Sequence, residues 1–315
     1  MPRSSRRCTT VPCPPTRSSW ERSASAARSV PSPAWSGAWP KRPVRDSGAC
    51  SCPPGLAEPP APAISRSSGW RESVSSPGVS QPDVGVVVVA AGAGVRAGPG
   101  EPKQFRPILG VPMLLRALRP FTSHPEVRQV VIALPPGYAE RPPDWLGKLR
   151  GERLEFVPGG AQRVDSVRAG LDALPDDATI ILIHDAVRPF VSRGTIDAVI
   201  TRARAGVGAV AAVPTSDTLK EIGQGSHRPT PRITRTVDRE RIWRAQTPQG
   251  FPRQMLRDAY AQLGATANGG APSDDAEVCE RAGFPVELIP DSPYNFKITT
   301  ADDFRIAEAL ARELR

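Results

Sequence analysis

The chain has 315 residues, enough for one large domain or two, and its hydrophobic content of 39% is modest for a folded protein. The formal net charge is +9, but residues 1–80 hold 11 Lys and Arg against 4 Asp and Glu, so residues 81–315 carry only +2. Because the excess of positive charge is confined to residues 1–80, it gives no reason to expect residues 81–315 to bind nucleic acid. No run of about twenty apolar residues occurs, so the sequence also excludes a membrane-spanning helix.

Residues 1–80 are rich in Arg, Ser, Pro and Ala and show neither helical nor strand periodicity. We expect this extension to be disordered, because it cannot bury enough apolar surface to offset the entropy of the chain. Three origins fit it: translation from a start codon placed too far upstream, an acid-poor targeting sequence, or a functional tail that would use its four tryptophans. The folded domain is therefore predicted to span residues 81–315.

Four of the five cysteines lie in this extension, at spacings that do not fit paired Cys-x-x-Cys zinc ligands, and the chain has only three histidines. A metal cluster is therefore not expected. The remaining thiol, Cys279, falls within a helical pattern and is predicted to pack rather than to react. This cysteine usage suits a reducing compartment.

The most informative stretch begins at Val86. The four valines 86–89 show no polar alternation, which is typical of a strand buried on both faces of a parallel sheet. The strand ends in residues with little or no side chain, so backbone N–H groups can approach an anion there. Arg96 and Lys103 follow as two cations on the same loop. Together these features predict a phosphate-binding loop that contains Ala90, Ala91, Gly92 and Gly94.

A Gly-x-Gly sequence after a strand also opens dinucleotide-binding domains. Two observations argue against that function here. Gly98, Pro99, Gly100 and Pro102 prevent the helix that should follow, and no acidic residue ends a second strand about twenty residues later. A plain glycine turn with solvated cations is the structural alternative.

Strand and helix patterns then alternate to the end of the chain. Apolar residues at helical spacing predict helices over residues 113–122, 196–205, 252–263 and 301–314. Apolar runs predict strands over residues 127–134, 154–157, 179–183, 207–213 and 286–290. Two short strands around a Gly- and Pro-rich loop predict a projecting hairpin over residues 214–237. This succession indicates an α/β fold: a Rossmann-like, open, mostly parallel sheet of about seven strands, with helices on both faces and a β-hairpin arm.

A second candidate binding loop follows the strand over residues 154–157. Gly159 and Gly160 precede a helix that starts near Gln162, which would place backbone N–H groups at the positive end of a helix. Arg163 and Ser166 are three residues apart and share a face of that helix. An ordinary connection with a surface arginine is the structural alternative.

Asp185 and Arg188 come just after the strand over residues 179–183. In open α/β sheets, ligands bind beyond the carboxyl ends of the strands, which is where these residues stand. The carboxylate has the chemistry to hold Mg²⁺ or substrate hydroxyls, and the arginine to bind a phosphate or orient the acid. A mutual structural salt bridge is the alternative. Further along, Ser273 is predicted to be the N-cap of a helix.

Five motifs from about Asp83 to Arg315 resemble those of sugar- and polyol-phosphate nucleotidyltransferases, and specifically the 2-C-methyl-D-erythritol 4-phosphate cytidylyltransferase family. The first is Ala-Ala-Gly-x-Gly-x-Arg with Pro-Lys-Gln-Phe in residues 90–105. The others are His-Asp-Ala-x-Arg-Pro at 184–189, Thr-Val-Asp-Arg at 236–239, Gln-Thr-Pro-Gln-x-Phe at 246–251 and Asn-x-Lys-Ile-Thr at 295–299. Residues 1–80 take no part in the resemblance.

The resemblance implies three groups of site residues. The catalytic cations would be Arg96 and Lys103, which stabilise the triphosphate and the departing pyrophosphate, together with Arg239 and Lys297, which position the attacking phosphate. The nucleotide would be bound by Ala90, Ala91, Gly92, Gly94, Arg96, Lys103, Gly160, Ser166, Ala186 and Lys297. The acceptor would be bound by Asp185, Arg188, Thr218, Arg239, Thr247 and Ser273.

The resemblance also implies partners. The substrates would be CTP and a polyol phosphate, and Mg²⁺ would be held mainly through the CTP phosphates, with Asp185 as the candidate side-chain ligand. The arm over residues 214–237 would form a homodimer and carry Arg239 into the partner's site. Neither nucleic acid nor a membrane is an expected partner. The expected location is cytoplasmic, or organellar if the extension is a transit peptide.

In the implied reaction, CTP and 2-C-methyl-D-erythritol 4-phosphate give the CDP-linked polyol and pyrophosphate. This reaction needs no general base or covalent nucleophile, and the sequence shows no arrangement of residues typical of either. A phosphate oxygen is already ionised near neutral pH, so no general base is needed, and no Ser-His-Asp or Cys-His arrangement is evident. Three rival functions stay open: transfer to another polyol phosphate such as ribitol 5-phosphate, non-catalytic nucleotide sensing, and a nicotinamide-dependent oxidoreductase.

Overall fold

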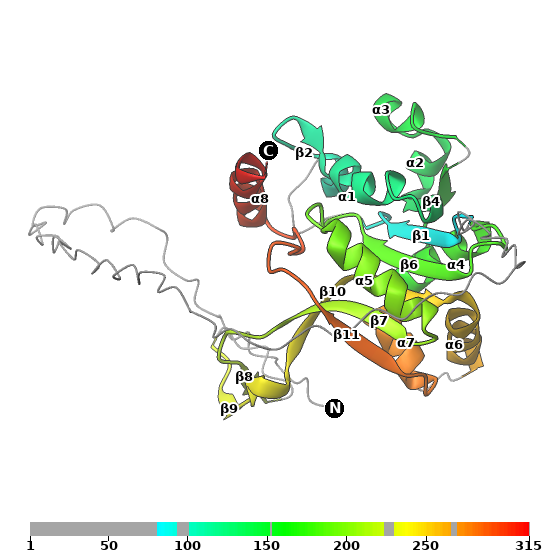
Figure 1. The fold of residues 1–315 in the computed structure, drawn as a ribbon. Helices are drawn as coiled ribbons and strands as arrows, with labels where there is room; N and C mark the ends of the chain where they lie inside the picture. The colour runs from blue at the N-terminus through cyan, green and yellow to red at the C-terminus, as the bar shows by residue number, and fades with distance from the viewer. Residues whose placement is uncertain (1–80, 93–100, 152, 224–229, 266–269, 315) are drawn as a thin grey trace, which may run out of the picture. The chain divides into compact units, whose positions relative to one another are not determined.

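The structure, a computed structural model, describes residues 81–92, 101–151, 153–223, 230–265 and 270–314 (Figure 1). The extension over residues 1–80 lies outside these ranges, and so do Gly94 and Arg96 of the first loop. The expectations for these residues therefore stay predictions.

A seven-stranded sheet forms the centre of the fold, in the order β11-β7-β10-β6-β1-β4-β5 (Figure 1). All neighbouring strands pair in parallel except β10, which runs antiparallel to both β6 and β7. The predicted mostly parallel α/β sheet is thus confirmed. The bounds are β1 (Val84–Val89), β4 (Val127–Leu134), β5 (Leu154–Pro158), β6 (Ile180–Asp185), β7 (Gly208–Pro214), β10 (Trp243–Pro252) and β11 (Val286–Pro290).

Helices cover both faces of the sheet. One face packs against α1 (Met113–Thr122), α2 (Pro136–Glu140), α3 (Asp144–Gly147) and α5 (Arg193–Arg204). The other packs against α4 (Arg163–Ala173), α6 (Arg253–Ala265) and α7 (Asp275–Arg281). The last helix, α8 (Ala301–Glu313), packs beside the small hairpin of β2 (Pro107–Ile108) and β3 (Val111–Pro112).

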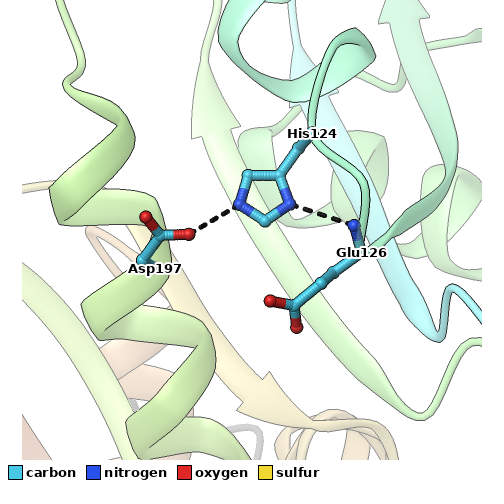
Figure 2. Close-up of side chains that lie close together, drawn as sticks. All are labelled: His124, Glu126 and Asp197. Carbon is cyan, nitrogen blue, oxygen red and sulfur yellow. Dashed lines mark hydrogen bonds and ion pairs between the residues drawn. The ribbon is translucent and has the colours of Figure 1, made fainter. Parts of the chain in front are cut away.

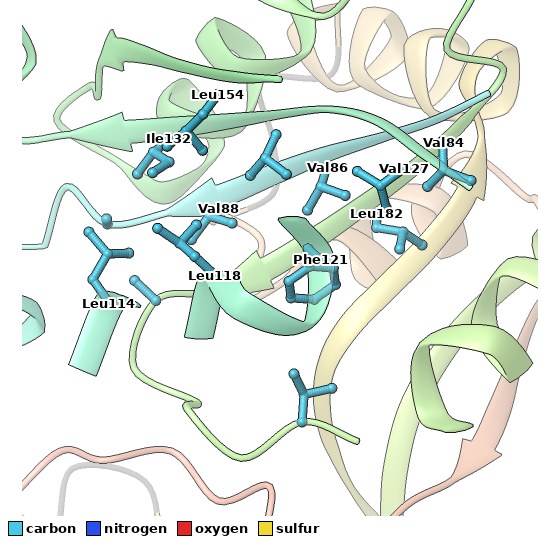
Figure 3. Close-up of a cluster of buried hydrophobic side chains, with 14 of the residues drawn as sticks. Val84, Val86, Val88, Leu114, Leu118, Phe121, Val127, Ile132, Leu154 and Leu182 are labelled. Atoms are coloured by element: carbon cyan, nitrogen blue, oxygen red, sulfur yellow. The ribbon is translucent and has the colours of Figure 1, made fainter. Parts of the chain in front are cut away.

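Strand β1 supplies the core on both faces, as its unbroken valine run predicts. Val86 and Val88 pack with Phe121 of α1 in one cluster (Figure 3), whereas Val87 belongs to the cluster on the opposite face. These three valines and Phe121 are fully buried. A Cβ added at Gly170 of α4 would lie 2.4 Å from Val87 Cγ1, so the closeness of α4 to the sheet requires glycine there.

The expected arm is present as β8 (Lys220–Ile222) and β9 (Ile233–Thr236), an antiparallel pair outside the main sheet (Figure 1). All seven of its strand residues are exposed, including the apolar Ile222 and Ile233 at 47% and 61%. No helix in the described part of the chain has the length and apolarity to cross a membrane.

The predicted N-cap of α7 is wrong by one residue. Asp274, not Ser273, is the N-cap, and its carboxylate accepts a hydrogen bond from the Glu277 backbone at 2.9 Å. The hydroxyl of Ser273 instead donates to the Glu277 carboxylate at 2.8 Å. Both residue types favour N-caps, so the sequence alone did not decide between neighbours.

Candidate active site

A cavity of about 540 Å³ opens where β1, β5 and β6 end. It lies at the carboxyl edge of the parallel strands, where ligands bind in open α/β folds. Its lining comes from five separate parts of the chain: Val89–Gly92, Lys103 with Gln104, Gly160–Arg163 with Ser166, Asp185–Val187, and Lys297.

The first loop is tied to the short 3-10 helix Lys103–Phe105 by one buried side chain. Gln104 Nε2 donates to the carbonyls of Ala90 at 2.6 Å and Gly92 at 3.4 Å. This places Lys103 at the cavity, where its Nζ donates to the Ile298 carbonyl at 3.3 Å. Because Ile298 follows Lys297 in the chain, the two lysines face one cavity although 194 residues separate them.

The second loop packs directly on the first. A Cβ added at Gly159 would lie 2.3 Å from the Cβ of Ala91, so this contact requires glycine. The N–H of Gly160 donates to Ser166 Oγ at 3.2 Å, and that hydroxyl donates to the Gln162 carbonyl at 3.3 Å. Ser166 therefore fixes the loop from within, and it also lines the cavity as the sequence predicts.

Asp185 is the one acidic residue in the cavity lining that the structure describes, and three cations surround it. Lys297 Nζ lies 2.9 Å from Oδ2, Arg188 Nε 3.5 Å from Oδ2, and Arg163 Nε 3.7 Å from Oδ1. Burial alone would raise the pKa of Asp185, but Lys297, Arg163 and Arg188 hold it well below its usual range. The carboxylate is therefore always ionised at neutral pH.

Arg188 stands behind Asp185 and is not part of the cavity lining. Its Nη1 donates to the Asn295 carbonyl at 2.9 Å and its Nη2 to the Ala245 carbonyl at 3.4 Å. These bonds hold the segment that carries Lys297 against β10. A contact of Arg188 with substrate stays a prediction. In the structure the arginine orients Asp185 and, through the Asn295 carbonyl, the segment that carries Lys297.

Thr247 supports Asp185 from β10, where the register of pairing with β7 shifts between Ala245 and Gln249. The Asp185 N–H donates to Thr247 Oγ1 at 3.0 Å. His184 Nε2 donates to the Arg188 carbonyl, so the Thr247 hydroxyl donates to His184 Nδ1 at 3.0 Å. Complete burial lowers the pKa of His184 to about 4, and the ring is neutral.

Of the remaining predicted site residues, some line the cavity and others do not. Ala186 is buried in the cavity wall. Thr218 and Arg239 are exposed near the arm, and Ser273 is exposed before α7; none of these three lines the cavity in this chain. Gln104 and Arg163 line it without having been assigned a role from the sequence.

Away from the cavity, one group of three potential metal ligands occurs among the described residues: His124, Glu126 and Asp197 (Figure 2). Glu126 N–H donates to His124 Nδ1 at 3.2 Å, so Nε2 carries the ring proton and donates to Asp197 Oδ1 at 2.8 Å. Arg204 pairs with the Glu126 carboxylate. These hydrogen bonds and the ion pair with Arg204 occupy the three side chains and tie α5 to the start of β4.

The sheet, its two small-residue loops and the lysines that share a cavity define a nucleotidyltransferase of the sugar- and polyol-phosphate class. The match to a family model is more specific. Residues 84–313 match the model for IspD, 2-C-methyl-D-erythritol 4-phosphate cytidylyltransferase, and the chain belongs to this family.

Relatives and solved structures agree. The chain is 39% identical over 240 residues to a 2-C-methyl-D-erythritol 4-phosphate cytidylyltransferase of Syntrophus aciditrophicus, covering 74% of this chain and 97% of that protein. Identity to the Streptomyces coelicolor enzyme of the same name is 40% over 234 residues, with coverage of 73% and 85%. The crystal structure of the Thermus thermophilus enzyme superposes with a TM-score of 0.58 at 36% identity, covering 72% and 98%.

Proposed function

We propose that this chain transfers the cytidylyl group of CTP to 2-C-methyl-D-erythritol 4-phosphate, giving 4-diphosphocytidyl-2-C-methyl-D-erythritol and pyrophosphate, a step of isoprenoid precursor biosynthesis. Family membership supports the reaction. The observation that carries it is the convergence of Lys103 and Lys297 on one cavity beside the loop over residues 90–92. Two cations facing small-residue backbone suit a substrate with several phosphates.

The residues divide the work by position. Lys103 and the N–H groups after β1 would bind the triphosphate and stabilise charge on the departing pyrophosphate, with Arg96 added from the same loop. Gly160 and Ser166 would bind the cytosine ring. Lys297 would align the attacking phosphate for in-line displacement. No proton need be removed from that phosphate, so no general base is required.

The cavity fits Mg²⁺ only in company with the nucleotide. Asp185 is the sole acidic side chain in the described lining, and Lys297, Arg163 and Arg188 already neutralise it. We propose that the triphosphate oxygens hold the ion, with Asp185 at most a secondary ligand. When bound, Mg²⁺ would supply Lewis-acid neutralisation of phosphate charge.

We further propose a homodimer formed through the arm, in which Arg239 and Thr218 complete the partner's site. The exposed Ile222 and Ile233 support it, because paired apolar residues on a free hairpin favour a covering partner. So does the position of Arg239, which does not line the cavity of its own chain. The unpaired, buried Cys279 agrees with a cytoplasmic location.

Pyrophosphate release tests the reaction. The full chain with Mg²⁺ is given each of the four ribonucleoside triphosphates with 2-C-methyl-D-erythritol 4-phosphate or ribitol 5-phosphate. Release with CTP and the methylerythritol phosphate alone is expected. Release with ribitol 5-phosphate instead would reassign the acceptor, and CTP binding without release from any pair would identify a sensor.

Mixed dimers test the arm. Arg239→Ala and Lys297→Met variants are each expected to be inactive, but a heterodimer would contain one site with both native residues. About a quarter of all sites should therefore recover after subunit exchange. No recovery, or a monomer by light scattering, would contradict the assignment of Arg239 to the partner's site.

A further inference from the structure

A buried chain of side chains runs from α6 to the wall of the cavity. Tyr260 Oη donates to Asp275 Oδ1 at 2.6 Å, and Arg163 Nη1 lies 2.6 Å from Asp275 Oδ2. The same guanidinium extends its Nε toward Asp185 Oδ1 at 3.7 Å. Asp275 is fully buried and Tyr260 is 4% exposed, so neither contacts a ligand in the cavity.

This series of side chains is also fixed at its Tyr260 end. Arg168 of α4 donates to the Tyr260 carbonyl at 3.0 Å and its guanidinium lies 5.5 Å from the centre of the Tyr260 ring. The Asp275 N–H donates to Gln249 Oε1 at 3.1 Å. Asp275 is therefore held by α4, α6 and β10 together, because its carboxylate contacts Arg163 and Tyr260 while its N–H contacts Gln249.

The position of Asp275 determines how the nearby cations are shared between two carboxylates. Arg163, Arg188 and Lys297 face the two carboxylates of Asp185 and Asp275. Arg163 Nη1 lies 2.6 Å from Asp275, while Arg163 Nε stays 3.7 Å from Asp185 Oδ1 and leaves Oδ2 of that carboxylate to Lys297 and Arg188. Arg163 Nη2 is buried without a hydrogen-bond partner among the described residues, so the guanidinium has a donor to spare if Asp275 releases it.

We propose that Tyr260 and Asp275 are positioning residues that hold Arg163 away from Asp185, so that Lys297 keeps the orientation in which it aligns the attacking phosphate. Arg163 would not react with the substrate. The inference rests on the proposed function of Lys297 and adds to it a restraint from behind the cavity.

Asp275→Asn is the direct test. The asparagine oxygen can still accept from Tyr260, but its NH₂ group would face the Arg163 donors, and two donors repel. Arg163 should then move onto Asp185 and displace Lys297. We expect kcat to fall about 30-fold with the KM for CTP unchanged or lower, because one buried negative charge near an anion site is lost.

Two further variants separate positioning from stability. Tyr260→Phe keeps the carboxylate and removes one hydrogen bond, so kcat should fall about fivefold. Val278→Ala trims a fully buried side chain of the same helix, α7, and should lower the melting temperature while leaving kcat within twofold. Tyr138→Phe, in α2 and outside the cavity lining, controls for loss of a tyrosine hydroxyl elsewhere.

A crystal structure of the Asp275→Asn protein gives a result that does not depend on turnover. Arg163 within hydrogen-bond distance of Asp185, with Lys297 displaced, would support the proposal. Arg163 unmoved, or kcat of both Asp275→Asn and Tyr260→Phe within twofold of wild type, would overturn it. If Asp275→Asn does not fold, the kcat of Tyr260→Phe decides alone. A wild-type protein that releases no pyrophosphate from CTP would refute the proposed function. The crystal structure of Asp275→Asn would still show whether Asp275 holds Arg163 away from Asp185.

Discussion

Replacing Lys297 by Met should remove catalysis and leave the fold intact. Lys297 Nζ lies 2.9 Å from Asp185 Oδ2, and 42% of its side chain is exposed, so the ammonium group reaches both the carboxylate and the cavity. Removing one donor that stabilises transition-state charge typically costs about 3 kcal/mol, or roughly a 100-fold to 1,000-fold loss of kcat. Met keeps a chain of similar length, so the loss is one of charge rather than of volume.

The same variant should be nearly as stable as wild type. The Lys297 side chain is 42% exposed, so solvent screens its charge, and we expect its pairing with Asp185 to contribute about 1 kcal/mol to the free energy of unfolding. Asp185 also keeps Arg188 at 3.5 Å and Arg163 at 3.7 Å, so its buried charge is not left alone. Steady-state pyrophosphate release gives kcat, and urea unfolding followed by circular dichroism gives stability. Lys148→Met, at an exposed turn, is the matched control. A Lys297→Met enzyme within threefold of wild type would refute the role assigned to this lysine.

Three other predictions concern the frame around the site. Phe121→Ala removes a fully buried ring and should lower the free energy of unfolding by about 3–5 kcal/mol, whereas Tyr294→Ala, at a 59% exposed ring, should change it little; equal effects by urea unfolding would contradict the packing described. His184 stays neutral in the fold to about pH 4 while the unfolded ring binds a proton near pH 6.5, so acidification over this window should destabilise the protein by up to about 3 kcal/mol. NMR titration that found His184 protonated near pH 6.5 would contradict this. Burial raises the pKa of Cys279 to about 12, so a thiol reagent at pH 8 should modify it only on unfolding.

Much of the sheet was predictable because its strands are short apolar runs. The valines of β1 have no polar alternation, and the structure buries them on both faces. Strand β10 was not predicted, since its sequence Trp-Arg-Ala-Gln-Thr-Pro-Gln-Gly-Phe-Pro shows neither alternation nor β-branched enrichment. It is a strand because β6 and β7 pair with it on either side, a tertiary cause that no local pattern records.

The site was predictable where a motif is local and less so where it depends on distant contacts. Lys103 and Lys297 could be named from their flanking residues, and the structure brings both to one cavity. Asp275 gave no signal, because an aspartate in the first turn of a helix is ordinary. Its burial against Arg163 and Tyr260 depends on how α4, α6 and α7 pack on the sheet.

The central claim is that one cavity, between the loop after β1 and the loop after β5, binds the nucleotide. A crystal structure of the full chain with CTP and Mg²⁺, without acceptor, tests it most directly. We predict the triphosphate beside Gly92 and Lys103, the cytosine ring against Gly160 and Ser166, and Lys297 next to the α-phosphate. A nucleotide bound elsewhere, for instance in the hollow between Leu115 of α1 and Leu154 of β5, would contradict the account.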